Sequence, residues 1–103
     1  MNYQTLLTQL NEGILTITIN RPEKLNALNQ QVINELDQVF DEVNANDEIC
    51  GVILTGSGAK AFVAGADISE FTSFTSAQAK KMAENGHRVF NKIEATSKPV
   101  IAA

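Results

Sequence analysis

The sequence contains one cysteine, one histidine and no tryptophan. The single cysteine, Cys50, cannot form a disulfide within the chain, which agrees with a reducing compartment. One cysteine and one histidine do not make a zinc ligand set, so we expect no metal site. These shortages exclude the small domains that depend on disulfides or structural zinc for their stability.

Positive charge is also scarce, with 8 Lys and Arg against 12 Asp and Glu and a net charge of −4. No cluster of basic residues is long enough to follow a phosphate backbone, so we expect no nucleic-acid partner. The first residues carry no basic leader, and no apolar run approaches the roughly 18 residues of a membrane span. We therefore expect a cytoplasmic protein that does not bind membranes.

Strand signals occur in three places within the first 55 residues. Apolar residues alternate with threonine over 15–19, which predicts a half-buried strand. The turn-forming residues 11–13 predict a hairpin that joins this strand to an earlier one over 3–10. Arg21-Pro22 ends the strand, since proline cannot donate to the ladder. The short β-branched run at 51–55 predicts a buried strand that is apolar on both faces.

Helix signals separate these strands. Apolar residues spaced three and four apart predict an amphipathic helix from Asn29 to about Asn46. A second helix is predicted from Thr75, which forms a capping-box pattern with Gln78, and Lys98-Pro99 is expected to end it. Residues 100–103 start another apolar strand, so we expect the chain to be truncated. The alternation of strands and helices indicates an α/β domain.

Three groups of residues are candidate sites from the pattern alone. Residues 56–61 fit the dinucleotide fingerprint G-x-G-x-x-A, but no helical pattern follows, so a plain surface turn is favoured. Asp67 and Glu70 could act as an acid and a base, although capping of a short helix is favoured. His87 has no Ser, Cys or acid placed to pair with it, and is interpreted as a surface or partly buried helix residue. The small residues of AFVAGADIS, 61–69, indicate a ligand-facing loop whose backbone makes the contacts.

Four segments together resemble the enoyl-CoA hydratase, or crotonase, family. They are NRPEKLNAL (20–28), VILTG (52–56), KAFVAGADI (60–68) and KPVIAA (98–103), in the family's order and spacing. The resemblance covers the whole chain and implies an α/β crotonase-type fold, a spiral of ββα units. Residues 1–103 would then be the N-terminal part of a single domain, in a homo-oligomer that is a trimer or hexamer.

The resemblance also implies the site residues. In this family the G-A-D loop supplies a backbone N–H that binds the thioester carbonyl oxygen, and by the motif match this catalytic donor is the N–H of Ala66. Such a preorganised donor stabilises an enolate-like transition state. The motifs imply a substrate-binding set of Lys24, Leu25, Ala27, Lys60, Ala64, Gly65, Ala66, Asp67 and Ile68. Lys24 and Lys60 would face the phosphates of coenzyme A, whereas Ser69 stands where some members carry a phosphate-binding lysine.

The implied activity is addition of water to 2-trans-enoyl-CoA to give 3-hydroxyacyl-CoA, in fatty-acid or related acyl-CoA metabolism. No metal or redox cofactor is implied, because coenzyme A is part of the substrate. Enoyl-CoA isomerisation, another acyl-CoA reaction on the same scaffold, and a non-catalytic CoA-binding module are the alternatives. The family's second oxyanion donor and its two catalytic glutamates follow the K-P-V-I-A-A motif, so Glu70 and Glu94 do not correspond to them.

Overall fold

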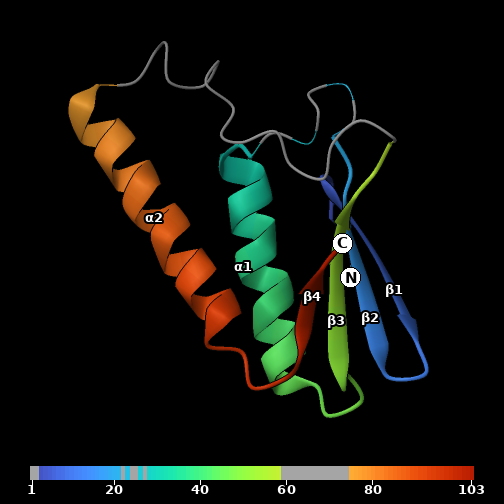
Figure 1. Cartoon of the computed structure of the whole chain (residues 1–103). Helices are drawn as coiled ribbons and strands as arrows, with labels where there is room; N and C mark the ends of the chain where they lie inside the picture. Colours follow the sequence, from blue (N-terminus) through green and yellow to red (C-terminus); the bar gives the residue numbers. More distant parts are fainter. Residues whose placement is uncertain (1–2, 22, 24–25, 27, 59–74) are drawn as a thin grey trace.

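The computed structural model describes residues 3–21, 23, 26, 28–58 and 75–103. Its elements, in chain order, are β1 (Leu6–Asn11), β2 (Ile14–Ile19), α1 (Gln30–Ala45), β3 (Gly51–Gly56), α2 (Ser76–Glu94) and β4 (Val100–Ala102). The strands form one sheet in the order β1-β2-β3-β4, in which β1 is antiparallel to β2 and the other neighbours are parallel (Figure 1). The predicted α/β class is confirmed.

The predicted hairpin between the first two strands is present, although β1 begins at Leu6 rather than Tyr3. Glu12 and Gly13 connect the strands, and both have positive φ, 52° and 84°, as in the two-residue turns that match strand twist. A Cβ at Gly13 would lie 3.2 Å from Sγ of Cys50, which is free and exposed. This turn therefore favours glycine for both its conformation and its space.

Helix α1 follows the predicted bounds, with its two flanking asparagines as caps. Oδ1 of Asn29 accepts from the Val32 N–H at 2.9 Å, and the Asn46 N–H donates to the Glu42 carbonyl at 2.9 Å. Nζ of Lys98 donates to the carbonyls of Val43 and Asn46, at 2.5 and 2.6 Å. Both ends of α1 thus have partners for backbone groups that the helix leaves unpaired.

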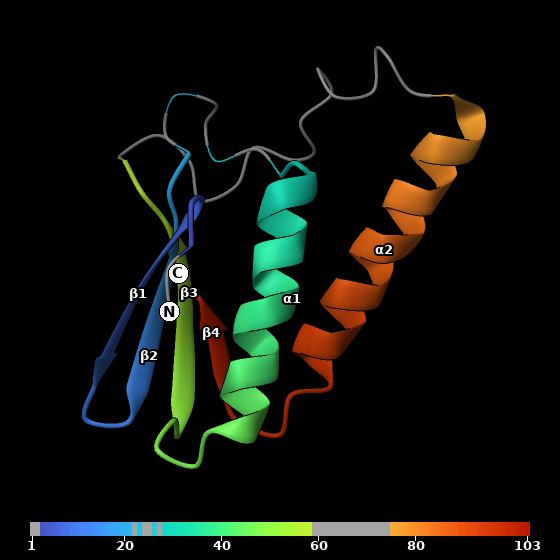
Figure 2. The same cartoon turned by 180° about the vertical axis from the view of Figure 1, so that it is seen from behind.

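The core lies between α1 and one face of the sheet. On β2 the alternating residues Leu15, Ile17 and Ile19 are buried, as predicted, and Val39 and Phe40 of α1 are fully buried. The two parallel connections, through α1 and through α2, place both helices on this same side (Figures 1 and 2). Burial of apolar side chains here is the main stabilising contribution to the fold.

The opposite face of the sheet is less covered than the sequence predicted. Val52 and Leu54 of β3 are buried, but Ile53, on the other face, is half-buried and Ile101 of β4 is 61% exposed. The prediction of a strand covered on both faces is therefore not met within the described part of the chain. There, the helices cover one face only.

Helix α2 begins at the predicted capping box, in which Thr75 and Gln78 exchange backbone and side-chain hydrogen bonds. It ends at Glu94, earlier than the predicted stop at Lys98-Pro99. The helix packs mainly against α1 rather than the sheet, with Val89 as its one buried residue (Figure 2). Neither α1 nor α2 combines the length and hydrophobicity that a membrane crossing requires.

Candidate functional site

Two neighbouring parallel strands, β2 and β3, end at the same edge of the sheet. Ile19 pairs with Gly56 at the end of this ladder, and the Ser57 N–H donates to the Ile19 carbonyl at 2.9 Å. In open α/β sheets, ligands bind outside the carboxyl ends of parallel strands. The segments that follow β2 and β3 are those in which the sequence predicts the coenzyme A contacts and the oxyanion loop. Both segments therefore begin at the same edge of the sheet.

Asn26 joins the two segments. Its side chain accepts from the Arg21 N–H through Oδ1 at 2.9 Å and donates to the Ser57 carbonyl through Nδ2 at 2.8 Å. Its backbone N–H also donates to the Arg21 carbonyl at 2.7 Å. Asn26 is only 1% exposed and has a positive φ of 58°, a conformation that asparagine tolerates better than most residues. One amide thus links Arg21, which follows β2, to Ser57 at the end of β3.

The sequence patterns indicate no role for Asn26, although the residue lies within the segment NRPEKLNAL. The one feature of the sequence that could have pointed to Asn26 is its polarity within the otherwise apolar run L-N-A-L, which directly precedes the N-cap residue of α1. A side chain that both donates and accepts is suited to bridging two backbone segments. The missing information was the partner, because only the fold brings Ser57 next to it.

The predicted site residues lie outside the part of the chain that the structure describes. This holds for the whole proposed set of Lys24, Leu25, Ala27, Lys60, Ala64, Gly65, Ala66, Asp67 and Ile68. It also holds for Glu70 and for the last positions of the dinucleotide pattern. Their roles remain predictions, and the described neighbours Arg21, Asn26, Leu28 and Ser57 mark the edge from which they extend.

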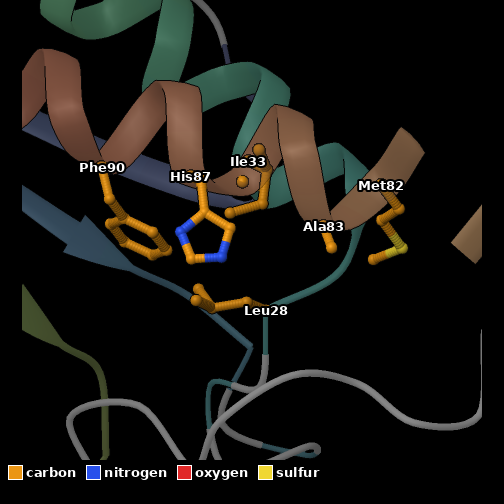
Figure 3. A pocket seen from close by; sticks show the side chains of 7 residues that line it. Leu28, Ile33, Met82, Ala83, His87 and Phe90 are labelled. Carbon is orange, nitrogen blue, oxygen red and sulfur yellow. The ribbon is translucent and has the colours of Figure 1, made fainter. Parts of the chain in front are cut away.

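An apolar cavity lies next to this edge, between α1 and α2. It has a volume of about 230 Å³ and is lined by Leu28, Ile33, Met82, Ala83, Gly86, His87 and Phe90 (Figure 3). Leu28 comes from the segment after β2, two residues beyond Asn26. Leu28, the last residue of the segment that contains the N-R-P motif, therefore forms part of the cavity wall. Its lining is suited to an apolar group of modest size.

His87 is an exposed residue of α2, which confirms its interpretation as a surface helix residue. The same residue also lines the cavity, which the sequence did not predict. Figure 3 shows its ring projecting from α2 on the side of Leu28, beside Phe90. Within the described residues, no group of His, Cys, Asp and Glu is arranged to hold a metal ion.

An ion cluster links the two helices that form the cavity. Asp37 of α1 accepts from Arg88 at 3.2 and 2.9 Å and also from Lys92, which contacts Asp41 at 2.6 Å. Hydrogen bonds from Arg88 and Lys92 lower the pKa of the Asp37 carboxyl from 3.8 to about 2. The same contacts with Asp37 raise the pKa values of Arg88 and Lys92. The cluster lies one helical turn beyond Ile33 and serves as a clamp, not as an acid/base site.

The sheet, its two helical crossovers and the linked segments at its edge are those of a crotonase-type α/β protein. The sequence profile of the enoyl-CoA hydratase/isomerase family matches residues 9–103, and the chain belongs to this family. The match confirms the predicted family.

Curated relatives and solved structures agree with this assignment. The chain is 42% identical over 103 residues to a short-chain-enoyl-CoA hydratase of Clostridium acetobutylicum and 39% identical to a crotonyl-CoA hydratase of Syntrophomonas wolfei. Each alignment covers 100% of this chain and 40% of the relative, so the chain spans about two fifths of their length.

The solved structure of an enoyl-CoA hydratase from Bacillus anthracis superposes with a TM-score of 0.93 at 29% identity, covering 96% of this chain and 39% of that one. An enoyl-CoA hydratase/carnithine racemase from Magnetospirillum magneticum superposes with a TM-score of 0.91 at 35% identity, and the match covers 98% of this chain and 39% of that one. The predicted crotonase-type fold is confirmed for this portion of the structure.

Proposed function

We propose that the protein containing this chain is an enoyl-CoA hydratase, which adds water to 2-trans-enoyl-CoA to give 3-hydroxyacyl-CoA. The observation that carries the proposal is the similarity over all 103 residues to two proteins named as hydratases. The bond from Asn26 to Ser57 supports it, because it links the segment proposed to bind coenzyme A to the strand that precedes the oxyanion loop.

The proposed chemistry depends on charge at the thioester oxygen. Addition of water to the conjugated double bond moves negative charge onto this oxygen, and a fixed N–H donor there lowers the barrier. We assign this donor to the backbone of Ala66. Lys24 and Lys60 are proposed to bind the coenzyme A phosphates, while Leu25, Ala27, Ala64, Gly65, Asp67 and Ile68 shape the surrounding walls.

The cavity between α1 and α2 is proposed to receive the acyl chain. It is nearly apolar, and its Leu28 directly follows the segment proposed to bind coenzyme A. Its volume of about 230 Å³ is below the roughly 300–1,000 Å³ of pockets for drug-sized ligands. The described part of the cavity has room for a short acyl group.

The remaining expectations are part of the same proposal. Family membership supports an acyl-CoA thioester as the substrate. We propose that coenzyme A is part of this substrate and that the reaction needs no metal or redox cofactor. We propose a cytoplasmic homo-oligomer, a trimer or hexamer, that acts in fatty-acid or related acyl-CoA metabolism. Nucleic acid and membranes are not proposed as partners.

Enoyl-CoA isomerisation is the second candidate, because the matched family includes isomerases as well as hydratases. The two reactions are separated by incubating the full-length protein that contains this chain with a 2-trans-enoyl-CoA and with a 3-enoyl-CoA. Hydration removes the absorbance of the conjugated thioester, whereas isomerisation of the second substrate creates it. Hydration of the first substrate supports the proposal, and turnover of the second substrate alone supports the isomerase. Binding of coenzyme A with no turnover of either indicates a non-catalytic module.

A further inference from the structure

Among the described residues that line the cavity between α1 and α2, only His87 has a polar side chain. Ala83 and Phe90, which flank His87 at helical spacings of four and three, line the same cavity. Residues at these spacings share one helix face, so His87 lies in the middle of the face that α2 turns toward the cavity. Figure 3 shows the imidazole on the same side of the helix as the Phe90 ring.

The imidazole has no hydrogen-bond or ion-pair partner within the described residues. The adjacent Arg88 is held by Asp37 and Asn85, so it does not pair with a ligand in the cavity through its bound nitrogens. A neutral imidazole offers one N–H donor and one nitrogen acceptor. An apolar cavity that held only hydrocarbon would leave both groups to solvent.

Gly86 shows that this wall of the cavity is open. It lies inside α2, where glycine lowers helix stability, yet a Cβ built on it meets no atom within 4 Å in the described part of the chain. Neither packing nor a positive φ requires glycine at this position. Among the described residues, none fills the space beside Gly86 on this wall of the cavity.

We propose that His87 is a specificity-determining residue that hydrogen-bonds a neutral oxygen on the acyl chain. The preferred substrate is then a short enoyl thioester whose chain carries a hydroxyl group, rather than a plain alkyl chain. A hydroxyl both donates and accepts, which matches the two nitrogens of the ring. This inference rests on the proposed function, because it assumes that the acyl chain occupies the cavity.

The test compares matched pairs of 2-trans-enoyl-CoA thioesters of equal, short chain length, one ending in a methyl group and the other in a hydroxymethyl group. The kcat/KM of the full-length protein is measured for both members of each pair. His87→Leu, which keeps the bulk but removes both nitrogens, lowers kcat/KM for the hydroxylated member by about threefold to tenfold. The value for the methyl member stays the same or rises. His87→Gln, which keeps a donor and an acceptor, preserves most of the preference.

Gly86→Ala provides a steric control, because it narrows the cavity and leaves the imidazole in place. It is expected to lower kcat/KM for both members by a similar factor. The inference is overturned if His87→Leu changes both members equally or changes neither. If the unmodified protein hydrates neither member nor an unsubstituted enoyl-CoA of any length, the proposed function itself fails, and this inference fails with it.

Discussion

Asn26 and Ser57 are 31 positions apart, yet the amide of one donates to the carbonyl of the other. The same amide accepts from the Arg21 N–H, and the Asn26 backbone N–H donates to the Arg21 carbonyl, so three backbone groups of Arg21 and Ser57 are bonded to one buried residue. Burial makes these bonds important because an unpaired buried donor or acceptor loses its contact with water without compensation. The link from Arg21 to Ser57 therefore depends on a side chain to which no catalytic role is assigned.

Replacement of Asn26 by Ala is expected to lower the free energy of unfolding by about 1–3 kcal/mol, because it leaves the Arg21 N–H and the Ser57 carbonyl without this partner. Asn44→Ala, at an exposed position of α1, is the matched control and changes stability by less than about 0.5 kcal/mol. Urea denaturation of the full-length variants measures both. Equal effects of the two substitutions would show that the bridge does not stabilise the protein.

Lys24 and Lys60 test the proposed coenzyme A contacts. Replacing either by Ala in the full-length protein is expected to raise KM for acyl-CoA more than it lowers kcat, and the effect shrinks at high salt because exposed charges are screened. Lys80→Ala is the control, since Lys80 is an exposed α2 residue whose ion pair is a 4.0 Å contact with Glu84. An affinity that changes no more in the two test variants than in the control would remove both lysines from the site.

The two helices were the most predictable elements, because each carries a regular apolar spacing and a recognisable cap. Thr75 caps α2 as its capping-box pattern indicates, and the structure shows that Asn29, where the first helix was expected to begin, caps α1. The surface that α2 packs against was not predictable, since an apolar face does not specify its partner. Phe90 is 42% exposed although it lies on the side of α2 that faces the cavity. The contacts between α1 and α2 depend instead on Asp37, whose partners lie on a distant part of the chain.

The lowered pKa of Asp37 predicts that the free energy of unfolding depends on pH in the acid range. Its folded pKa of about 2 is below the ordinary value of 3.8, so the carboxylate binds a proton less readily in the folded protein than in the unfolded chain. The ionised Asp37 carboxylate therefore contributes its full stabilisation of the folded protein above the pKa that the group has in the unfolded chain. This contribution to the free energy of unfolding is lost as pH falls from about 4 toward 2.

In urea titrations at a series of pH values, Asp37→Asn is expected to lose less stability over this interval than the unmodified protein. The exposed Asp47, changed to Asn, is the control and should keep the unmodified slope. The ion-cluster explanation is wrong if Asp37→Asn and the unmodified protein lose stability in parallel between about pH 4 and 2.

Two glycines of the chain are expected to respond to alanine in opposite ways. Gly86→Ala should raise the free energy of unfolding by about 0.5–1 kcal/mol, because alanine favours the helix and no described atom lies within 4 Å of the new Cβ. Gly13→Ala should lower it, since φ is +84° and the Cβ would lie 3.2 Å from Cys50. Thermal unfolding of both variants measures the difference, and a destabilised Gly86→Ala would show that the space beside His87 is occupied by the protein itself.

The order of elements could be predicted from the sequence, but the site could be predicted only in part. Alternation and helical periodicity are local properties, so β2 and α1 follow from their own residues. The pairing of β2 with β3 and the cavity between the helices are long-range properties, which no short segment specifies. The resemblance supplied the family, which the profile match confirms, whereas the role of Asn26 and the cavity position of His87 needed the structure.

The proposed hydratase uses the backbone of Ala66 as an oxyanion donor, and Ala66→Pro in the full-length protein removes that N–H with little added bulk. The kcat for hydration of a 2-trans-enoyl-CoA is expected to fall by about 10²–10³, the usual effect of losing one such donor, while affinity for coenzyme A falls much less. Ala66→Gly keeps the N–H and should retain most of the activity, which controls for the effect of proline on the loop. A correctly folded Ala66→Pro variant that hydrates the substrate at close to the unmodified rate would contradict the assignment.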